Sequence, residues 1–146
     1  AIDNFCRNFE LLSPAVQSRL TVENDDRASL YSTAELVDEI HGRIGIPVVH
    51  DIHHHLFTNR GMSQEEAMGL AASTWGDVIP VIHYSESRAK EYNDPKIRPQ
   101  AHSDLIQDYI NTYAYNVHIM IEAKHKELAL LGYREMHGAK LLTEAA

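Results

Sequence analysis

The sequence predicts an α/β fold with parallel strands, and three observations lead to that expectation. Apolar stretches typical of β-strands recur about every 30 residues, which is the length of one strand–helix–strand step. Signals for the start of a helix lie between these stretches. Each stretch also ends on a residue type that binds divalent metals, and in α/β proteins ligands gather at the carboxyl ends of the strands. The stretches are 20–23, 46–51, 78–83 and 118–122, and they end on Glu23, Asp51, His83 and Glu122.

The helices expected in the first half follow the chain from its start. Residues 5–12 have the pattern of the end of a helix, and Ser13 followed by Pro14 is typical of an N-cap with proline at the first helical position. Ser32 and Ser63 each begin a capping box and are followed by apolar residues at helical spacing. These signals predict one helix after the first strand and another after the second.

Two further helices are expected in the second half. A final helix is predicted to begin near Lys126. Before the last strand, a helix is predicted over 105–113 because apolar residues recur there at helical spacing. These residues are Leu105, Ile106, Tyr109, Ile110 and Tyr113.

About four strand–helix units make half of a (β/α)8 TIM barrel. A complete barrel takes about 250 residues, whereas this chain has 146. We therefore expect a single domain over residues 1–146 that forms a half-barrel, with an open four-stranded α/β domain as the alternative. The half-barrel is favoured because the chain opens in the pattern of the end of a helix rather than in a strand.

Composition agrees with an intracellular α/β protein. Hydrophobic residues make up 44% of the chain and charged residues 23%, which is enough to bury a core. No apolar run reaches the roughly 20 residues that span a bilayer, and no signal-peptide pattern is present, so no membrane association is expected. The single cysteine, Cys6, excludes an internal disulfide and is expected to be buried. A net charge of −8 argues against a simple basic surface for nucleic acid, unless bound metals add positive charge.

Residues with catalytic potential gather in clusters after the strands. An aspartate and three histidines lie within 51–55, and carboxylate with imidazole is a ligand set for manganese, iron or zinc. An exposed histidine-rich loop is the alternative there. The other clusters also have structural explanations: a capping turn at 23–26, a hydrogen-bonded histidine at 83–86 or 98–104, and a solvated helix start at 122–127. Their occurrence at the same end of successive strands favours a metal site.

Five segments, taken in order, resemble the UV-damage endonuclease family of metal-dependent barrel enzymes. The similarity runs from about residue 9 to residue 135 and corresponds to the C-terminal half of the family's barrel. The segments are RLTVENDD at 19–26, IPVVHDIHHH at 46–55, VIHYS at 81–85, RPQAHSD at 98–104 and MIEAKHKE at 120–127.

The resemblance implies a (β/α)8 barrel with about two or three divalent metal ions, commonly manganese, at the carboxyl end of the strands. Alternation of side chains along a strand would by itself favour His53 as the histidine that binds metal together with Asp51. The family's Asp-x-x-His pattern indicates His54 instead. Glu23, Asp51 and Lys124 would act in catalysis, with Glu23 as a bridging carboxylate and Lys124 either facing a substrate phosphate or forming an ion pair. By position, the metal ligands would be Glu23, Asp51, His54, His83, His102 and Glu122.

The activity that the resemblance implies is DNA repair. Damaged double-stranded DNA would be incised on the 5′ side of UV photoproducts by multi-metal hydrolysis, with the damaged nucleotides turned out of the duplex. No residue is assigned to DNA binding. Two alternatives stay open: a metal-dependent sugar isomerase or epimerase barrel, and a non-catalytic metal-binding fragment. The expected protein partners are the missing N-terminal half or a second copy of the chain.

Overall fold

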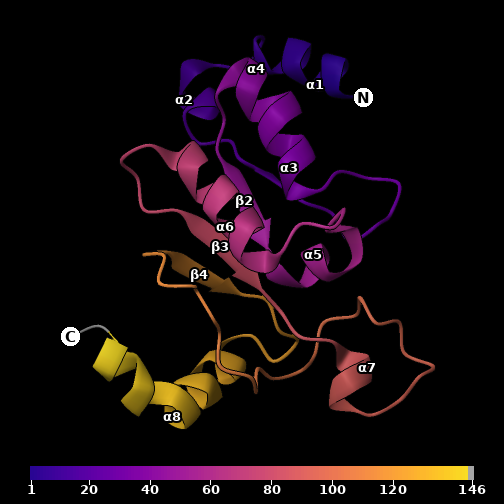
Figure 1. Ribbon diagram of the computed structural model, residues 1–146, viewed down its shortest axis with the longest axis vertical. Coiled ribbons are helices and arrows are strands. Elements are labelled where there is room, and N and C mark those ends of the chain that lie inside the picture. The colour runs from indigo at the N-terminus through magenta and orange to yellow at the C-terminus, as the bar shows by residue number, and fades with distance from the viewer. Residues whose placement is uncertain (145–146) are drawn as a thin grey trace.

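The computed structural model describes residues 1–144 and contains a sheet of four parallel strands in the order β1-β2-β3-β4 (Figure 1). The chain advances from α1 at one end of the molecule to α8 at the other, with helices between successive strands. This order confirms the expected α/β architecture with the topology of a half-barrel. Within residues 1–144, no helix combines the length and apolar character that crossing a bilayer requires.

The strands are β1 (Val22–Glu23), β2 (Val48–Asp51), β3 (Val81–Tyr84) and β4 (His118–Ile121). The α-helices are α1 (Ile2–Phe9), α2 (Pro14–Gln17), α3 (Thr33–Leu36), α4 (Gly42–Ile44), α5 (Ile52–Thr58), α6 (Gln64–Ala72), α7 (Arg88–Glu91) and α8 (Glu127–Glu144). A π-helical turn, Val37–His41, joins α3 to α4, and a 3-10 turn, Ser73–Trp75, follows α6.

The helix starts in the first half lie where the sequence predicts them. Pro14 is the first residue of α2, with Ser13 at the N-cap. Ser32 and Ser63 both form capping boxes. At Ser32, the hydroxyl accepts a hydrogen bond from the amide of Glu35, whose carboxylate accepts one from the Ser32 amide. These bonds satisfy backbone donors that the first turn of a helix leaves free.

One face of the sheet is covered by helices. Side chains alternate between the two faces along each strand. Val48 packs with Leu36 in one apolar cluster, and Ile119 packs against a second cluster that includes the buried Ala129 of α8. Cys6 belongs to the first cluster and is buried, as expected. The two clusters hold the helices against the strands.

The opposite face of the sheet is open. A groove of about 390 Å³ runs along it and is lined in part by Thr21, Val49 and Val81. Met120 of β4, which pairs with His83 on the same face, is 53% exposed. The outermost strands, β1 and β4, each have a neighbour in the sheet on one side only. In a complete barrel this face would point inward, and both edges would be paired.

We expect the isolated chain to associate with itself or with a polypeptide that supplies the other strands, because open edges and exposed apolar faces favour association. Light scattering over a range of concentrations measures this. Met120→Lys on the open face should reduce self-association, whereas Met136→Lys, at a 60% exposed position on α8, serves as the matched control. A stable monomer that unfolds cooperatively at high concentration would contradict the expectation.

The helix expected over 105–113 was wrong, because the structure has an irregular loop there. The carboxylate of Glu86 accepts hydrogen bonds from the amides of Gln107 and Asp108 at 2.8 to 3.2 Å. These backbone donors are therefore satisfied by a side chain from an earlier segment instead of by helical carbonyls. Tyr113, at the end of the expected helix, has a φ of 51°, which is outside the right-handed helical region.

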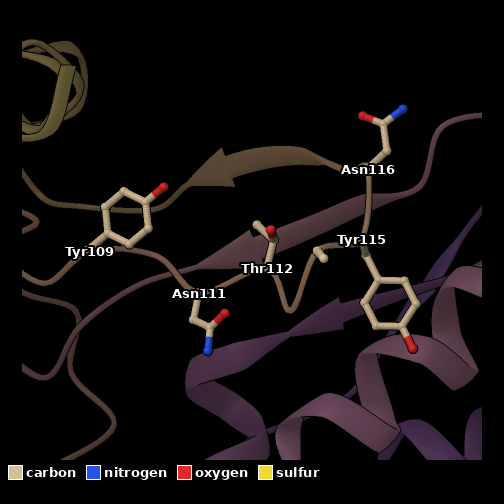
Figure 2. A pocket seen from close by; sticks show the side chains of 6 residues that line it. Tyr109, Asn111, Thr112, Tyr115 and Asn116 are labelled. Atoms are coloured by element: carbon tan, nitrogen blue, oxygen red, sulfur yellow. The ribbon is translucent and has the colours of Figure 1, made fainter. Parts of the chain in front are cut away.

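The loop over 105–117 still buries the apolar residues that suggested a helix. Ile106 and Ile110 lie in the cluster under α8, where the Ile110 amide donates to the Tyr133 hydroxyl. Further along, Tyr115 extends toward α6 (Figure 2), and a Cβ at Gly69 of that helix would overlap its hydroxyl. The apolar spacing therefore predicted burial correctly but not the backbone conformation.

Candidate metal centre

Two groups of acidic and imidazole side chains meet at the carboxyl end of the sheet. Glu23, Asp51 and His54 form one group, and Asp51, His83 and Glu122 form the other. Within each group, one candidate ligand atom per residue lies within 4.8 Å of the others. Asp51 belongs to both groups, so a single buried carboxylate lies between two possible metal positions.

The sheet register explains why these side chains meet. Asp51 and His83 are directly paired across β2 and β3, and Glu23 of β1 pairs with Val49, two residues before Asp51 on the same face. Glu122 follows β4 and extends the ladder, because its amide donates to the carbonyl of Tyr84 at 2.9 Å. Parallel strands in sequential order therefore bring four strand-end residues to one site, as the sequence predicted.

The imidazoles and carboxylates alternate across the site. Glu23 lies between two histidines, with His54 Nδ1 3.4 Å from its Oε1 and His83 Nδ1 3.2 Å from its Oε2. Glu122 lies between His83 Nδ1, at 3.3 Å, and His102 Nδ1, at 3.7 Å. All of the residues that the family resemblance proposed as ligands thus belong to one connected cluster.

The geometry after β2 favours His54 over His53 as the partner of Asp51. Asp51 is the N-cap of α5, and its Oδ1 accepts a hydrogen bond from the His54 amide at 2.7 Å. Because the chain turns into a helix at this point, strand alternation no longer applies. His53 is 2% exposed and packs against the rings of Phe57 and His102.

The buried carboxyl group of Asp51 is difficult to ionise without a nearby cation. Burial raises the pKa of its carboxyl group to about 7, although the hydrogen bond from the His54 amide opposes this shift. Its Oδ2 is buried without a hydrogen-bond partner. Buried polar atoms are nearly always satisfied, so a carboxylate oxygen that makes no hydrogen bond and lies 3.8 Å from His54 Nδ1 fits a divalent metal.

Glu23 and His83, beside Asp51, stabilise each other's charged forms. Burial alone would raise the pKa of Glu23, but the interactions with His83, Asp51 and His54 together outweigh it and lower that pKa. Contact with Glu23 raises the pKa of His83 despite burial. His83 Nδ1 is nevertheless buried without a hydrogen bond, because its neighbouring carboxylates are not aligned with the ring N–H. The donor set of carboxylates and imidazoles matches manganese, iron or zinc.

Lys124 lies beside the cluster rather than within it. Its side chain is exposed, and its amide donates to the Ser103 carbonyl at 2.9 Å. Burial lowers the pKa of His102, and the positive charge of Lys124 contributes to that shift. Among the residues whose side chains the structure describes (1–141 and 143), no carboxylate lies within ion-pair distance of the Lys124 ammonium group, so the ion pair that the sequence left open is not found there.

Asn24 is a site residue that the sequence analysis did not identify. It is 1% exposed and hydrogen-bonds to the backbone of Asp51. The only signal for it in the sequence is its position directly after Glu23, where a polar residue follows a strand end.

Comparisons with known proteins agree with this architecture. A family model described as UV-endonuclease UvdE matches residues 1–144. A protein named UV DNA damage endonuclease from Bacillus mycoides (strain KBAB4) is 33% identical over 142 residues, and one from Bacillus cereus (strain Q1) is 34% identical over 143 residues. These regions cover 90% and 91% of this chain but 42% of each relative, so the chain spans less than half the length of the relatives it matches.

A solved structure supports the fold. The structure described as "Crystal Structure of SacUVDE" superposes with a TM-score of 0.79 at 31% sequence identity, covering 98% of this chain and 47% of that chain. This match confirms the expectation of half of a TIM-type barrel. Because the family model covers all but the last two residues, the chain belongs to the UV-endonuclease UvdE family.

Proposed function

We propose that this chain is one half of a metal-dependent DNA repair endonuclease that hydrolyses the DNA backbone on the 5′ side of UV photoproducts. The observation that carries the proposal is the Asp51 carboxylate, which is shared by two groups of possible metal ligands. Paired metal positions suit in-line displacement at phosphate. The names of the relatives supply the substrate class, UV-damaged DNA.

The proposed metal ligands are the connected cluster of Glu23, Asp51, His54, His83, His102 and Glu122, and manganese is the proposed metal. A divalent ion there would act as a Lewis acid toward a phosphate oxygen and would make water a stronger nucleophile at neutral pH. Glu23, placed between His54 and His83, has one carboxylate oxygen facing each side and is suited to bridge two positions.

Lys124 is proposed to bind a phosphate of damaged double-stranded DNA. Its ammonium group is exposed beside His102 and is not neutralised by a carboxylate within the described residues, so it can attract the backbone. The acidic net charge of −8 makes such local positive charge important for binding. Action on DNA also supports the proposal that the protein is intracellular.

Incision of irradiated plasmid by this chain joined to a complementary half-barrel tests the proposed function. We expect manganese-dependent nicking that is faster on UV-irradiated than on unirradiated DNA. Conversion of ketoses by the same preparation, without nicking, would instead favour a sugar isomerase. Metal binding without either activity would identify a non-catalytic fragment.

Glu23→Gln should weaken manganese binding by about tenfold or more, because the amide keeps the shape of the side chain but removes the charge that attracts the metal. Isothermal titration calorimetry of the wild-type and variant chains measures this. Glu65→Gln is the matched control, since Glu65 is exposed on α6 away from the cluster. Equal affinities for wild type and Glu23→Gln would remove Glu23 from the ligand set.

A further inference from the structure

Asn24 connects the end of β1 to the end of β2 through its side chain. The β1–β2 pairing stops at Glu23 and Val49. Beyond it, the Asn24 Nδ2 donates to the Asp51 carbonyl at 3.0 Å, and its Oδ1 accepts from the Asp51 amide at 2.8 Å. The side-chain amide therefore acts as a peptide group of a neighbouring strand would, and it satisfies both backbone groups of a residue that is 0% exposed.

The backbone of Asn24 also fixes the ring of His54. The carbonyl oxygen of Asn24 lies 2.8 Å from His54 Nδ1. Because a carbonyl only accepts hydrogen bonds, this contact places the ring proton on Nδ1 and leaves the lone pair on Nε2. In metalloproteins, such a bond to the second ring nitrogen sets the tautomer and orientation of a ligating histidine.

A second contact holds the same turn against α5. The Thr58 hydroxyl donates to the carbonyl of Asp25 at 2.7 Å, and Thr58 is 1% exposed. Residues 24 and 25 are thus attached to both ends of α5, at His54 and Thr58. This double attachment limits how far Asn24 can move, so its bonds to Asp51 and His54 are kept together.

We propose that Asn24 is a positioning residue that holds Asp51 and His54 in the relative geometry of a metal-binding pair. This inference rests on the proposed function for the role of the metal, but the arrangement it describes belongs to the metal-free chain. Asn24 itself does not contact the metal in this scheme. Removing the Asn24 side chain should therefore loosen both proposed ligands, Asp51 and His54. Removing a side chain that only stabilises the fold should not have this effect.

The test compares Asn24→Ala with Ile40→Val, a control whose side chain packs in the apolar cluster with Cys6 and Leu36. Manganese affinity is measured by calorimetry, and the His54 tautomer of the metal-free chain is measured by long-range ¹H–¹⁵N NMR at alkaline pH. We expect Asn24→Ala to lower the affinity by about tenfold or more and to weaken the Nδ1–H preference, because the backbone carbonyl that bonds His54 Nδ1 remains but is no longer held against Asp51 by the side chain. Ile40→Val should lower the melting temperature while leaving both readouts unchanged.

The proposal would be overturned if folded Asn24→Ala bound manganese as tightly as wild type and kept the wild-type tautomer of His54. Asn24 would then have only a structural role. If Asn24→Ala does not fold, Asn24→Ser replaces it, because serine keeps a polar group but is too short to bond both backbone groups of Asp51. If the wild-type chain takes up no manganese, the metal-dependent function fails, and the His54 tautomer in the variants alone decides the role of Asn24.

Discussion

Asp51→Asn should reduce incision of UV-irradiated DNA by more than about a hundredfold when the chain is joined to the proposed complementary half-barrel. Asparagine keeps the shape and can still cap α5, but it lacks the charge that would bind metals on both sides of the residue. Plasmid relaxation measures incision, and circular dichroism checks the fold. Nicking at the wild-type rate would show that Asp51 is not a metal ligand.

The same substitution should stabilise the metal-free chain at alkaline pH. The folded-state pKa of Asp51 is raised from 3.8 to about 7, so its contribution to stability is present below pH 3.8 and is lost as the pH rises through about 7. At pH 8 the wild type carries a buried, ionised carboxylate whose Oδ2 makes no hydrogen bond and lies 3.8 Å from His54 Nδ1. Removing that charge should raise the free energy of unfolding by on the order of 1–3 kcal/mol.

Urea unfolding in the presence of a chelator, from pH 5 to pH 8, measures this difference. Burial of His50 makes the free energy of unfolding change with pH in the opposite direction. Burial lowers the pKa of His50 to about 4, so the stability that its neutral ring contributes is lost as the pH falls from 6.5 toward 4. His50 is present in both proteins, so its effect cancels when the variant is compared with wild type. The advantage of Asp51→Asn should grow as the pH rises, and a variant less stable than wild type at pH 8 would contradict the assigned cause.

The strands and the position of the site were predictable because both depend on local patterns. Apolar runs that end on Glu23, Asp51 and His83 place these residues on one face when the strands are parallel and sequential, as they are here. The capping boxes at Ser32 and Ser63 likewise need only neighbouring residues. Local chemistry of this kind can be recognised without tertiary structure.

The loop over 105–117 and the role of Asn24 depend on distant residues and could not be predicted in the same way. Gln107 is bonded by Glu86, which lies 21 positions earlier, and Asn24 is bonded to Asp51, 27 positions later. Spacing along the chain indicates which side chains are apolar, but it does not show which backbone amides a remote carboxylate will bind. Tertiary contacts of this kind override local helix propensity.

His102→Ala should abolish incision while leaving the fold intact. The side chain is 24% exposed, its Nδ1 lies 3.7 Å from Glu122, and the residue lies in the loop between α7 and β4 rather than in a strand or helix. Burial lowers the pKa of His102, which keeps the imidazole neutral at physiological pH, and a neutral imidazole has the lone pair that a metal requires.

The measurement is the rate of nicking of irradiated and unirradiated plasmid, together with manganese affinity and circular dichroism. His41→Ala is the matched control: this imidazole is also partly buried, but it bonds to the Ile46 carbonyl in the helical layer outside the cluster. We expect a loss of more than about a hundredfold for His102→Ala and little change for His41→Ala. Equal nicking by His102→Ala and wild type would remove His102 from the metal site, and equal nicking of irradiated and unirradiated DNA by the wild type would refute the proposed substrate.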